Sequence, residues 1–271
     1  MAATIIKQGR TLLSKLDRSM AVQLATAAAL AAVVLVVARH SGLWWCAAMV
    51  VVGAEGWGLA RRMPATRRRE LVFARLPVAV AGVAVAVIIA LESRLVSQFL
   101  TACTYVPLRW WWTAGAAREA GDGELVSHRL WRLLAVQALV FEAVFLAAAI
   151  VRLPAWLVLV VVWGGVYGTT YSVLSGWKER STAVLAATWA LVAAEVSWVL
   201  QLWLFTYTTA GGYVLVPQPA LILTALGYCF GSVYWSQRQG NLSRGRLTEY
   251  LLIGLILIVI VAVGTSWRGS I

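Results

Sequence analysis

Long apolar stretches recur along the whole chain, and short polar segments separate them. A bilayer core about 30 Å thick takes about 20 residues of helix, and eight stretches come close to that length. Segment 95–112 is shorter and contains Gln98, Thr101, Thr104 and Pro107, so it fits a spanning, a re-entrant or an interfacial arrangement. The eight clear stretches are residues 20–38, 43–60, 76–92, 131–151, 154–176, 182–206, 219–236 and 248–266.

The distribution of Lys and Arg favours one of these arrangements, because cytoplasmic loops collect both residues. If 95–112 crosses the membrane and the N-terminus is inside, 18 of the 23 Lys and Arg residues fall on the cytoplasmic side. If 95–112 does not cross, this asymmetry largely disappears. We therefore predict an all-α, polytopic transmembrane bundle of about nine helices, eight plus the short or re-entrant segment 95–112. Its N-terminus is cytoplasmic and its C-terminus is outside.

Composition supports this class and its domain organisation. Apolar residues make up 61% of the 271 residues and charged residues only 13%, which excludes an ordinary soluble domain. Residues 1–19 alternate basic and apolar positions, as a helix lying on anionic headgroups does. Residues 20–267 are predicted to form a single transmembrane bundle with no soluble domain. Arg outnumbers Lys 20 to 3, which we interpret as the coding bias of a GC-rich bacterium, so we expect the inner (plasma) membrane.

Three carboxylates interrupt the apolar stretches, namely Glu55, Glu142 and Glu195. A charged group near mid-bilayer is costly, so such residues face the bundle interior and often carry function. One interpretation makes them proton or cation sites. The other makes them protonated donors in interhelical hydrogen bonds with Gln137, Gln201, Thr188 or a Tyr hydroxyl.

No basic residue is predicted at the depth of these acids. If one of them were ionised, its partner would have to be Arg94, Arg109 or Arg152 reaching inward. Glu55 lies nearest the cytoplasmic end of its stretch and is the weakest of the three candidates.

Small residues form two stripes at four-residue spacing, which lets helix backbones approach closely. The stripes predict packing within the chain. A contact between copies of the chain, or a route lined by polar residues of 169–172, is an alternative. The stripe residues are Gly164, Gly168, Ser172 and Gly176 on one helix and Gly227 and Gly231 on another.

A basic inner loop contains a second group of candidates. Topology alone requires basic inner loops, and anionic lipid headgroups on the cytoplasmic side are the expected ligand. A nucleic-acid partner is not expected, because the loop is short and no nucleic-acid-binding fold surrounds it. The residues are Arg61, Arg62, Arg67, Arg68 and Arg69.

No catalytic, metal-binding or nucleotide-binding motif is found, so we expect neither an enzyme nor a cofactor. The favoured hypothesis is a small transporter or channel that uses Glu142, Glu195 and Glu55 as proton or cation sites. The alternative is a non-catalytic membrane subunit or scaffold of a larger envelope complex. A homo-oligomer is compatible with both.

Overall fold

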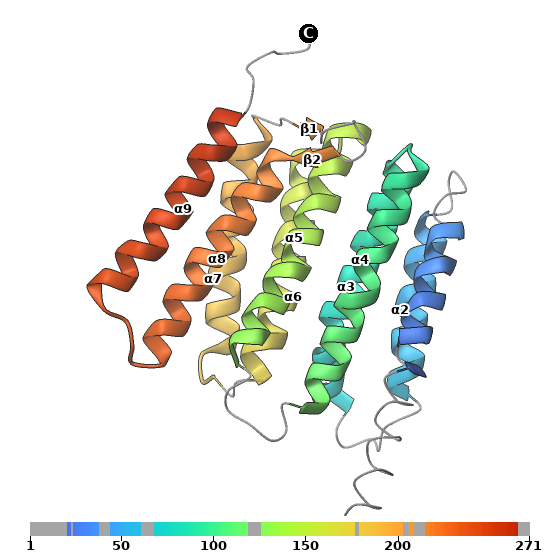
Figure 1. Cartoon of the computed structure of the whole chain (residues 1–271), viewed down its shortest axis with the longest axis horizontal. Coiled ribbons are helices and arrows are strands. Elements are labelled where there is room, and N and C mark those ends of the chain that lie inside the picture. The colour runs from blue at the N-terminus through green and yellow to red at the C-terminus, as the bar shows by residue number, and fades with distance from the viewer. Residues whose placement is uncertain are drawn as a thin grey trace, which may run out of the picture.

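A computed structural model describes residues 21–22, 24–37, 44–60, 68–118, 126–176, 179–202, 206–208 and 215–264. Over these residues the chain forms nine helices that run alternately up and down, together with two short strands (Figure 1). The helices are Leu24–Val37, α2 (Trp44–Ala60), α3 (Arg68–Leu91), α4 (Leu95–Arg118), α5 (Val126–Val151), α6 (Ala155–Gly176), α7 (Thr182–Gln201), α8 (Gln218–Arg238) and α9 (Arg244–Gly264).

The prediction of an all-helical fold class is confirmed over the described residues. Three helical segments are long and apolar enough to cross a membrane, namely Leu130–Val151, Ala155–Gly176 and Thr182–Gln201. Segment 95–112 is part of the continuous helix α4, which has 24 residues and lies beside α3 (Figure 1). A re-entrant hairpin at this segment is therefore wrong. Pro107 lies inside α4 and removes only one backbone donor from it.

Two tight turns at the same end of the bundle have clear local causes. Gln98 of α4 donates from Nε2 to the backbone carbonyls of Ile89 (3.0 Å) and Glu92 (2.7 Å). Carbonyls at a helix C-terminus have no partner within the helix, so this side chain satisfies the end of α3. After α5, Arg152 takes the left-handed conformation that commonly ends a helix (φ 56°), and α6 begins just after Pro154.

The strands form a small hairpin at the same end as these turns (Figure 1). β1 (Thr206–Thr208) pairs antiparallel with β2 (Leu215–Pro217), and Tyr207 lies opposite Val216. Pro217 then precedes α8, whose second residue, Pro219, needs no backbone donor there.

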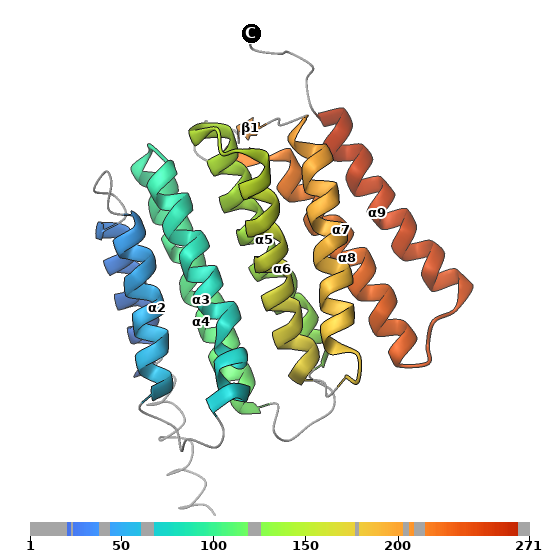
Figure 2. The same cartoon turned by 180° about the vertical axis from the view of Figure 1, so that it is seen from behind.

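Helix α3 is one of two central helices: it contacts α2, α4, α5 and α6, whereas α5 contacts α3, α4, α6 and α8. On one side α3 shares a core with Leu24–Val37, α2 and α4, centred on Val51, Ile89 and Tyr105. A second core lies among α5, α6, α7 and α8 and includes Phe141 and Phe145. Seen from behind, α6 and α7 run side by side along the second core (Figure 2).

The small-residue stripes pack only in part. A Cβ on Gly227 would meet Leu134 of α5 at 3.2 Å, and a Cβ on Gly231 would come closer still, at 2.5 Å, to Leu130 of the same helix. On α6, Gly168 approaches Leu76 of α3 and Ser172 is buried. Gly164, by contrast, has open space around the position of its Cβ, so it does not pack against another helix in the described part of the chain, and Gly176 is exposed.

Several predictions concern parts of the chain outside the described residues. The amphipathic helix 1–19 and the arginines Arg61, Arg62 and Arg67 lie there. Arg68 and Arg69 form the first turn of α3. The domain boundaries stay predictions.

The close approach of α2, α3 and α4 at Gly82 can be tested by adding one methyl group. We expect Gly82→Ala to lower the free energy of unfolding by about 1–3 kcal/mol, because its Cβ would overlap Val51 and lie 3.1 Å from the Tyr105 hydroxyl. Gly53→Ala on α2 is the matched control, since nothing lies within 4 Å of its added Cβ. Thermal unfolding in detergent measures both, and equal midpoints would contradict the packing described at Gly82.

Candidate functional site

The most buried carboxylate of the three candidates is Glu55 of α2, which is 2% exposed. Its Oε2 accepts a hydrogen bond from Nη1 of Arg75 on α3 (3.0 Å), and its Oε1 accepts one from Nε of Arg109 on α4 (2.7 Å). Both contacts are ion pairs, and both arginines are mostly buried, with side chains 22% and 14% exposed. One carboxylate thus ties three helices together.

A fourth helix joins this group through a hydroxyl. Nη1 of Arg109 donates to Oγ1 of Thr26 on the first helix (3.3 Å). Tyr105, one turn before Arg109 on α4, is 1% exposed, and the charges of Glu55 and Arg109 both act on its hydroxyl. We call Thr26, Glu55, Arg75 and Arg109 the Glu55 cluster. It combines one negative with two positive charges.

Helix geometry gives the depth of the cluster. Glu55, Arg75 and Arg109 lie five, seven and nine residues from the nearer ends of their helices. At 1.5 Å per residue these positions are roughly 8–14 Å inside the helix ends. These ends are the ones predicted to face the cytoplasm.

The Glu55 cluster corrects one sequence prediction. Two basic residues, Arg75 and Arg109, lie at the depth of Glu55 inside their helices, where none was expected. The error has a physical cause: α3 begins at Arg68, two turns before the apolar stretch starts, and α4 continues to Arg118. Helices thus carry charges beyond their apolar windows. Arg109 was correctly named as a possible partner of an ionised acid.

Glu142 lies in a different environment, at the contact between α3 and α5. It is roughly 2 Å from the midpoint of the apolar segment Leu130–Val151. Its side chain is partly buried, and its carboxylate interacts electrostatically with that of Glu92, which follows α3 and is 5% exposed. No ion pair to Glu142 forms among the described residues. The charge of a second acid, located just beyond the end of α3, therefore acts on Glu142.

The expectation that all three acids face inward is wrong for Glu195. It is exposed on α7, roughly 5 Å from the midpoint of that helix. Glu142 and Glu195 are therefore not two walls of one interior site. The reason is that α7 buries its small residues, such as Ala190 and Ala193, and the opposite face carries Glu195.

One of the polar residues expected to satisfy the acids, Gln137, forms its hydrogen bonds elsewhere. Gln137 of α5 donates from Nε2 to Thr170 Oγ1 (2.9 Å) and Thr169 Oγ1 (3.3 Å) of α6. Its Oε1 accepts from Nε1 of Trp189 on α7 (3.4 Å). This network links α5, α6 and α7 without any carboxylate. A hydrogen bond between Gln137 and a membrane carboxylate, one of the alternatives above, is therefore wrong.

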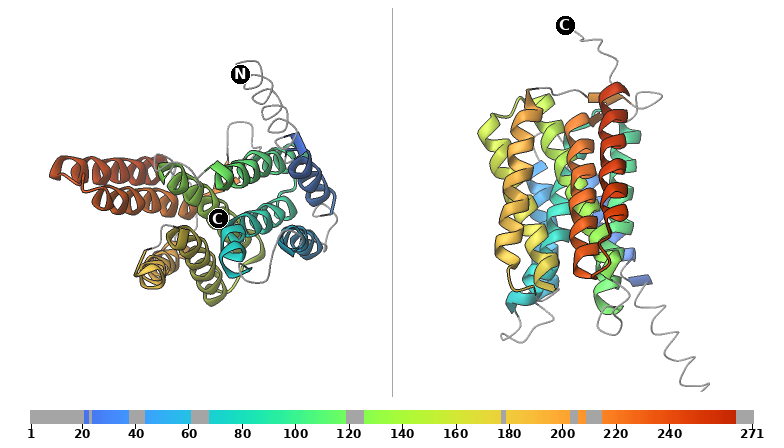
Figure 3. Two further views of the ribbon diagram at one scale, coloured as in Figure 1. Left: turned by 90° about the horizontal axis from the view of Figure 1, so that it is seen from below. Right: turned by 90° about the vertical axis from the view of Figure 1, so that its left-hand side faces the viewer.

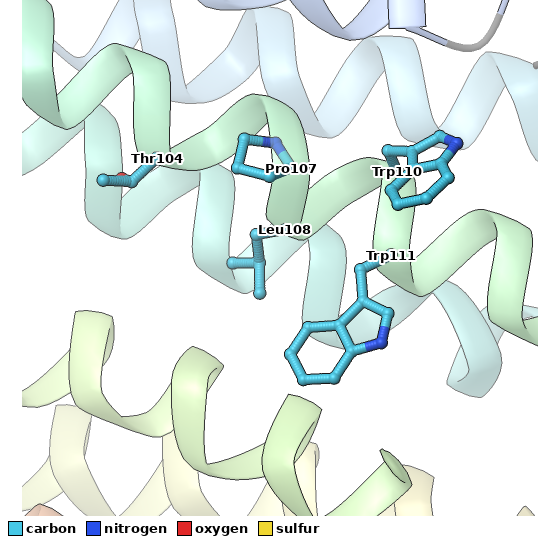
Figure 4. A pocket seen from close by; sticks show the side chains of 5 residues that line it. All are labelled: Thr104, Pro107, Leu108, Trp110 and Trp111. Atoms are coloured by element: carbon cyan, nitrogen blue, oxygen red, sulfur yellow. The ribbon is translucent and has the colours of Figure 1, made fainter. Parts of the chain in front are cut away.

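A pocket of about 470 Å³ lies along one face of α4. Figure 4 shows its lining residues, Thr104, Pro107, Leu108, Trp110 and Trp111. The hydroxyl of Thr104 donates to the carbonyl of Thr101 in the same helix (2.7 Å). The lining is thus mainly apolar, which suits a hydrocarbon chain better than a charged solute.

Neither metal chemistry nor known relatives add to this description. Within the described ranges, no three His, Cys, Asp or Glu residues lie close enough to hold a metal ion. No known protein family, curated protein or solved structure matches the chain. Conclusions about function therefore depend on the positions of the charged residues.

The burial of the Glu55 cluster predicts a large effect of removing its carboxylate. We expect Glu55→Gln to lower the free energy of unfolding by about 3–5 kcal/mol, because two buried guanidinium groups lose their counter-charge. Glu179→Gln is the matched control: Glu179 pairs with Arg238 at 2.7 Å, but their side chains are 28% and 35% exposed. Its loss should cost about 0–1 kcal/mol.

Thermal unfolding in detergent compares the two variants. A double-mutant cycle of Glu55→Gln with Arg109→Gln should give a coupling free energy of about 1 kcal/mol or more, since the two groups contact each other. Equal losses for Glu55→Gln and Glu179→Gln would contradict the importance of burial at this cluster.

Proposed function

We propose that this protein is a small multi-pass transporter or channel that moves protons or small cations, with Glu142 and Glu92 as the binding site. The observation that carries the proposal is an acid near the middle of an apolar helix that forms no ion pair among the described residues, and on which the charge of Glu92 also acts. Two carboxylates in a low-dielectric surrounding are unstable when both are charged, so the pair favours an added proton or a bound cation.

The proposal includes a topology of nine crossings in the inner membrane of a bacterium, with the N-terminus in the cytoplasm. Support comes from the alternating helix directions, from the three apolar helices and from the basic residues predicted at one end. Anionic lipids at that end would contact Arg61, Arg62, Arg67, Arg68 and Arg69. No enzyme activity or cofactor is part of the proposal.

Helix α3 connects the acid pair to the Glu55 cluster. Arg75 and Glu92 are roughly 25 Å apart along α3 and its C-terminal end, near its two opposite ends. A proton or cation arriving from the outer side meets Glu92 first and then Glu142, about 13 Å inside the end of α5. The ion pairs of Glu55 hold the inner half of α3 against α2 and α4. Binding of a proton or a cation to the acid pair therefore changes the charge at the outer end of α3, whose inner half is held by the ion pairs of Glu55.

A role as a membrane subunit or scaffold is the second candidate. The exposed acid Glu195 on α7 favours it, because a carboxylate on the outer face of an apolar helix calls for a protein partner. The two functions are compatible, since α7 does not contribute Glu195 to the acid pair.

Ion flux in proteoliposomes tests the transport proposal. With an imposed membrane potential and a pH-sensitive dye inside the vesicles, Glu142→Gln should reduce proton flux at least about tenfold, because a carboxamide does not act as an acid or a base near neutral pH. Glu92→Gln should reduce it as well. Glu195→Gln is the matched control and should retain the wild-type flux.

The same vesicles loaded with Na⁺ or K⁺ distinguish a cation from a proton as the transported ion. Unchanged fluxes of all three ions in Glu142→Gln would remove the transport proposal and leave the scaffold as the function to pursue. Vesicles without protein set the background leak.

A further inference from the structure

Helix α4 contains two buried hydroxyl groups that form no hydrogen bond within the described part of the chain. They belong to Ser97, which is 0% exposed, and to Tyr105, which is 1% exposed. Ser197 of α7 is equally buried, but its hydroxyl donates to the backbone carbonyl of Ala193 at 2.6 Å. Buried polar groups are almost always hydrogen-bonded, to protein or to ordered water, so the two hydroxyls of α4 call for an explanation.

The two hydroxyls belong to a row of polar side chains along one side of α4. Ser97, Thr101, Tyr105 and Arg109 follow one another at intervals of four residues, and we call these four residues the α4 ladder. Side chains four residues apart are neighbours on a helix surface, with about 5–6 Å between their Cβ atoms. A water molecule that forms hydrogen bonds with two hydroxyls spans a gap of this size.

The outer end of the α4 ladder lies beside Glu92, one of the two acids of the proposed ion site. Gln98, the residue after Ser97, donates from Nε2 to the backbone carbonyl of Glu92 at 2.7 Å. Only residues 92–94 separate α3 from α4. Glu92 and Ser97 are both buried, at 5% and 0% exposed. The ladder therefore begins at the acid that a proton arriving from the outer side meets first.

The inner end of the α4 ladder belongs to the Glu55 cluster. Arg109 donates from Nε to Oε1 of Glu55 at 2.7 Å, and the charges of both groups act on the Tyr105 hydroxyl. This hydroxyl lies beside Gly82 of α3, roughly 14 Å inside the outer end of that helix. Because an arginine side chain is only a donor, the carboxylate of Glu55 is the acceptor to which the proton of Tyr105 can pass.

The α4 ladder lies in the first half of the bundle. Seen along the helices, the first helix, α2, α3 and α4 form one group, on the opposite side of the bundle from α9 (Figure 3). Tyr105 packs in the core that these four helices share. From Ser97 to Arg109 the ladder covers roughly 18 Å along α4, which is more than half of a hydrocarbon core about 30 Å thick. Its two ends therefore lie toward opposite sides of the membrane.

We propose that the α4 ladder relays protons between Glu92 and Glu55, which makes the proton the ion that this protein transports. The inference rests on the transport function proposed above. Each hydroxyl oxygen accepts a proton from one side and releases its own proton to the other, so only O–H bonds form and break and no oxidant or reductant is needed. A metal cation moves as a whole and needs several oxygen ligands at once, which a single row of hydroxyls does not provide.

Proton flux into proteoliposomes, driven by a membrane potential, tests the relay. Tyr105→Phe and Ser97→Ala each remove one hydroxyl and keep the rest of the side chain. Each should reduce proton flux at least about tenfold, because a group that transfers the proton is lost. Ser197→Ala is the matched control: Ser197 is as buried as Ser97, but its hydroxyl is bonded within α7, so the wild-type flux should remain.

Thermal unfolding in detergent separates loss of the relay from loss of the fold. Tyr105→Phe and Ser97→Ala break no hydrogen bond between groups of the described chain, whereas Ser197→Ala breaks one. The unfolding midpoints of the two ladder variants should therefore fall no further than that of Ser197→Ala. A reduced flux at an unchanged midpoint is the result that a merely structural role of these hydroxyls does not produce.

Three results would overturn the relay. They are wild-type proton flux in both ladder variants, an equal loss of flux in Ser197→Ala, and flux of Na⁺ or K⁺ without proton flux in the wild-type protein. If Glu142→Gln loses flux while Tyr105→Phe and Ser97→Ala retain it, the relay is wrong and the transport function stands. If Glu142→Gln retains all fluxes, the transport function is wrong and the relay is wrong with it.

Discussion

A carboxylate among apolar helices needs a partner at its own depth, and much of this structure follows from how three such groups are satisfied. Glu55 is neutralised by two arginines from neighbouring helices. The charge of a second acid, Glu92, acts on Glu142. Glu195 lies on the outer surface of α7. The same residue type is therefore found in an ion-pair cluster, in a proposed ion site and on an exposed helix face.

The Glu55 cluster organises the first half of the bundle. Its ion pairs join α2, α3 and α4, and Arg109 extends the contact to Thr26 of the first helix. Apolar helices packed in lipid have little hydrophobic reason to choose one neighbour over another. Buried charges make one arrangement of neighbours more stable than the others, because a helix packed against the wrong neighbour leaves a buried charge without a counter-charge. In the second half, Gln137 and its contacts with Thr169, Thr170 and Trp189 make the equivalent link.

The proposed ion site and the exposed acid Glu195 lie on different helices. Glu142 belongs to α5 and Glu92 follows α3, whereas Glu195 lies on α7. The apolar pocket on α4 faces away from the Glu55 cluster, because Trp111 and Leu108 lie on a different side of the helix from Arg109.

The helical class, the apolar segments and the three unusual acids follow from the amino-acid sequence, because hydropathy and charge are properties of the residues alone. Arg109 is also recognisable there as a possible partner of an acid. The continuity of α4, the convergence of Arg75 and Arg109 on Glu55 and the outward position of Glu195 become visible only in the folded chain. Apolar residues surround the helices of a membrane bundle on nearly every side, so the sequence pattern carries little information about which face meets a neighbour. The choice of neighbouring helix is made in the folded chain, where small residues and charges on different helices come to lie at the same depth.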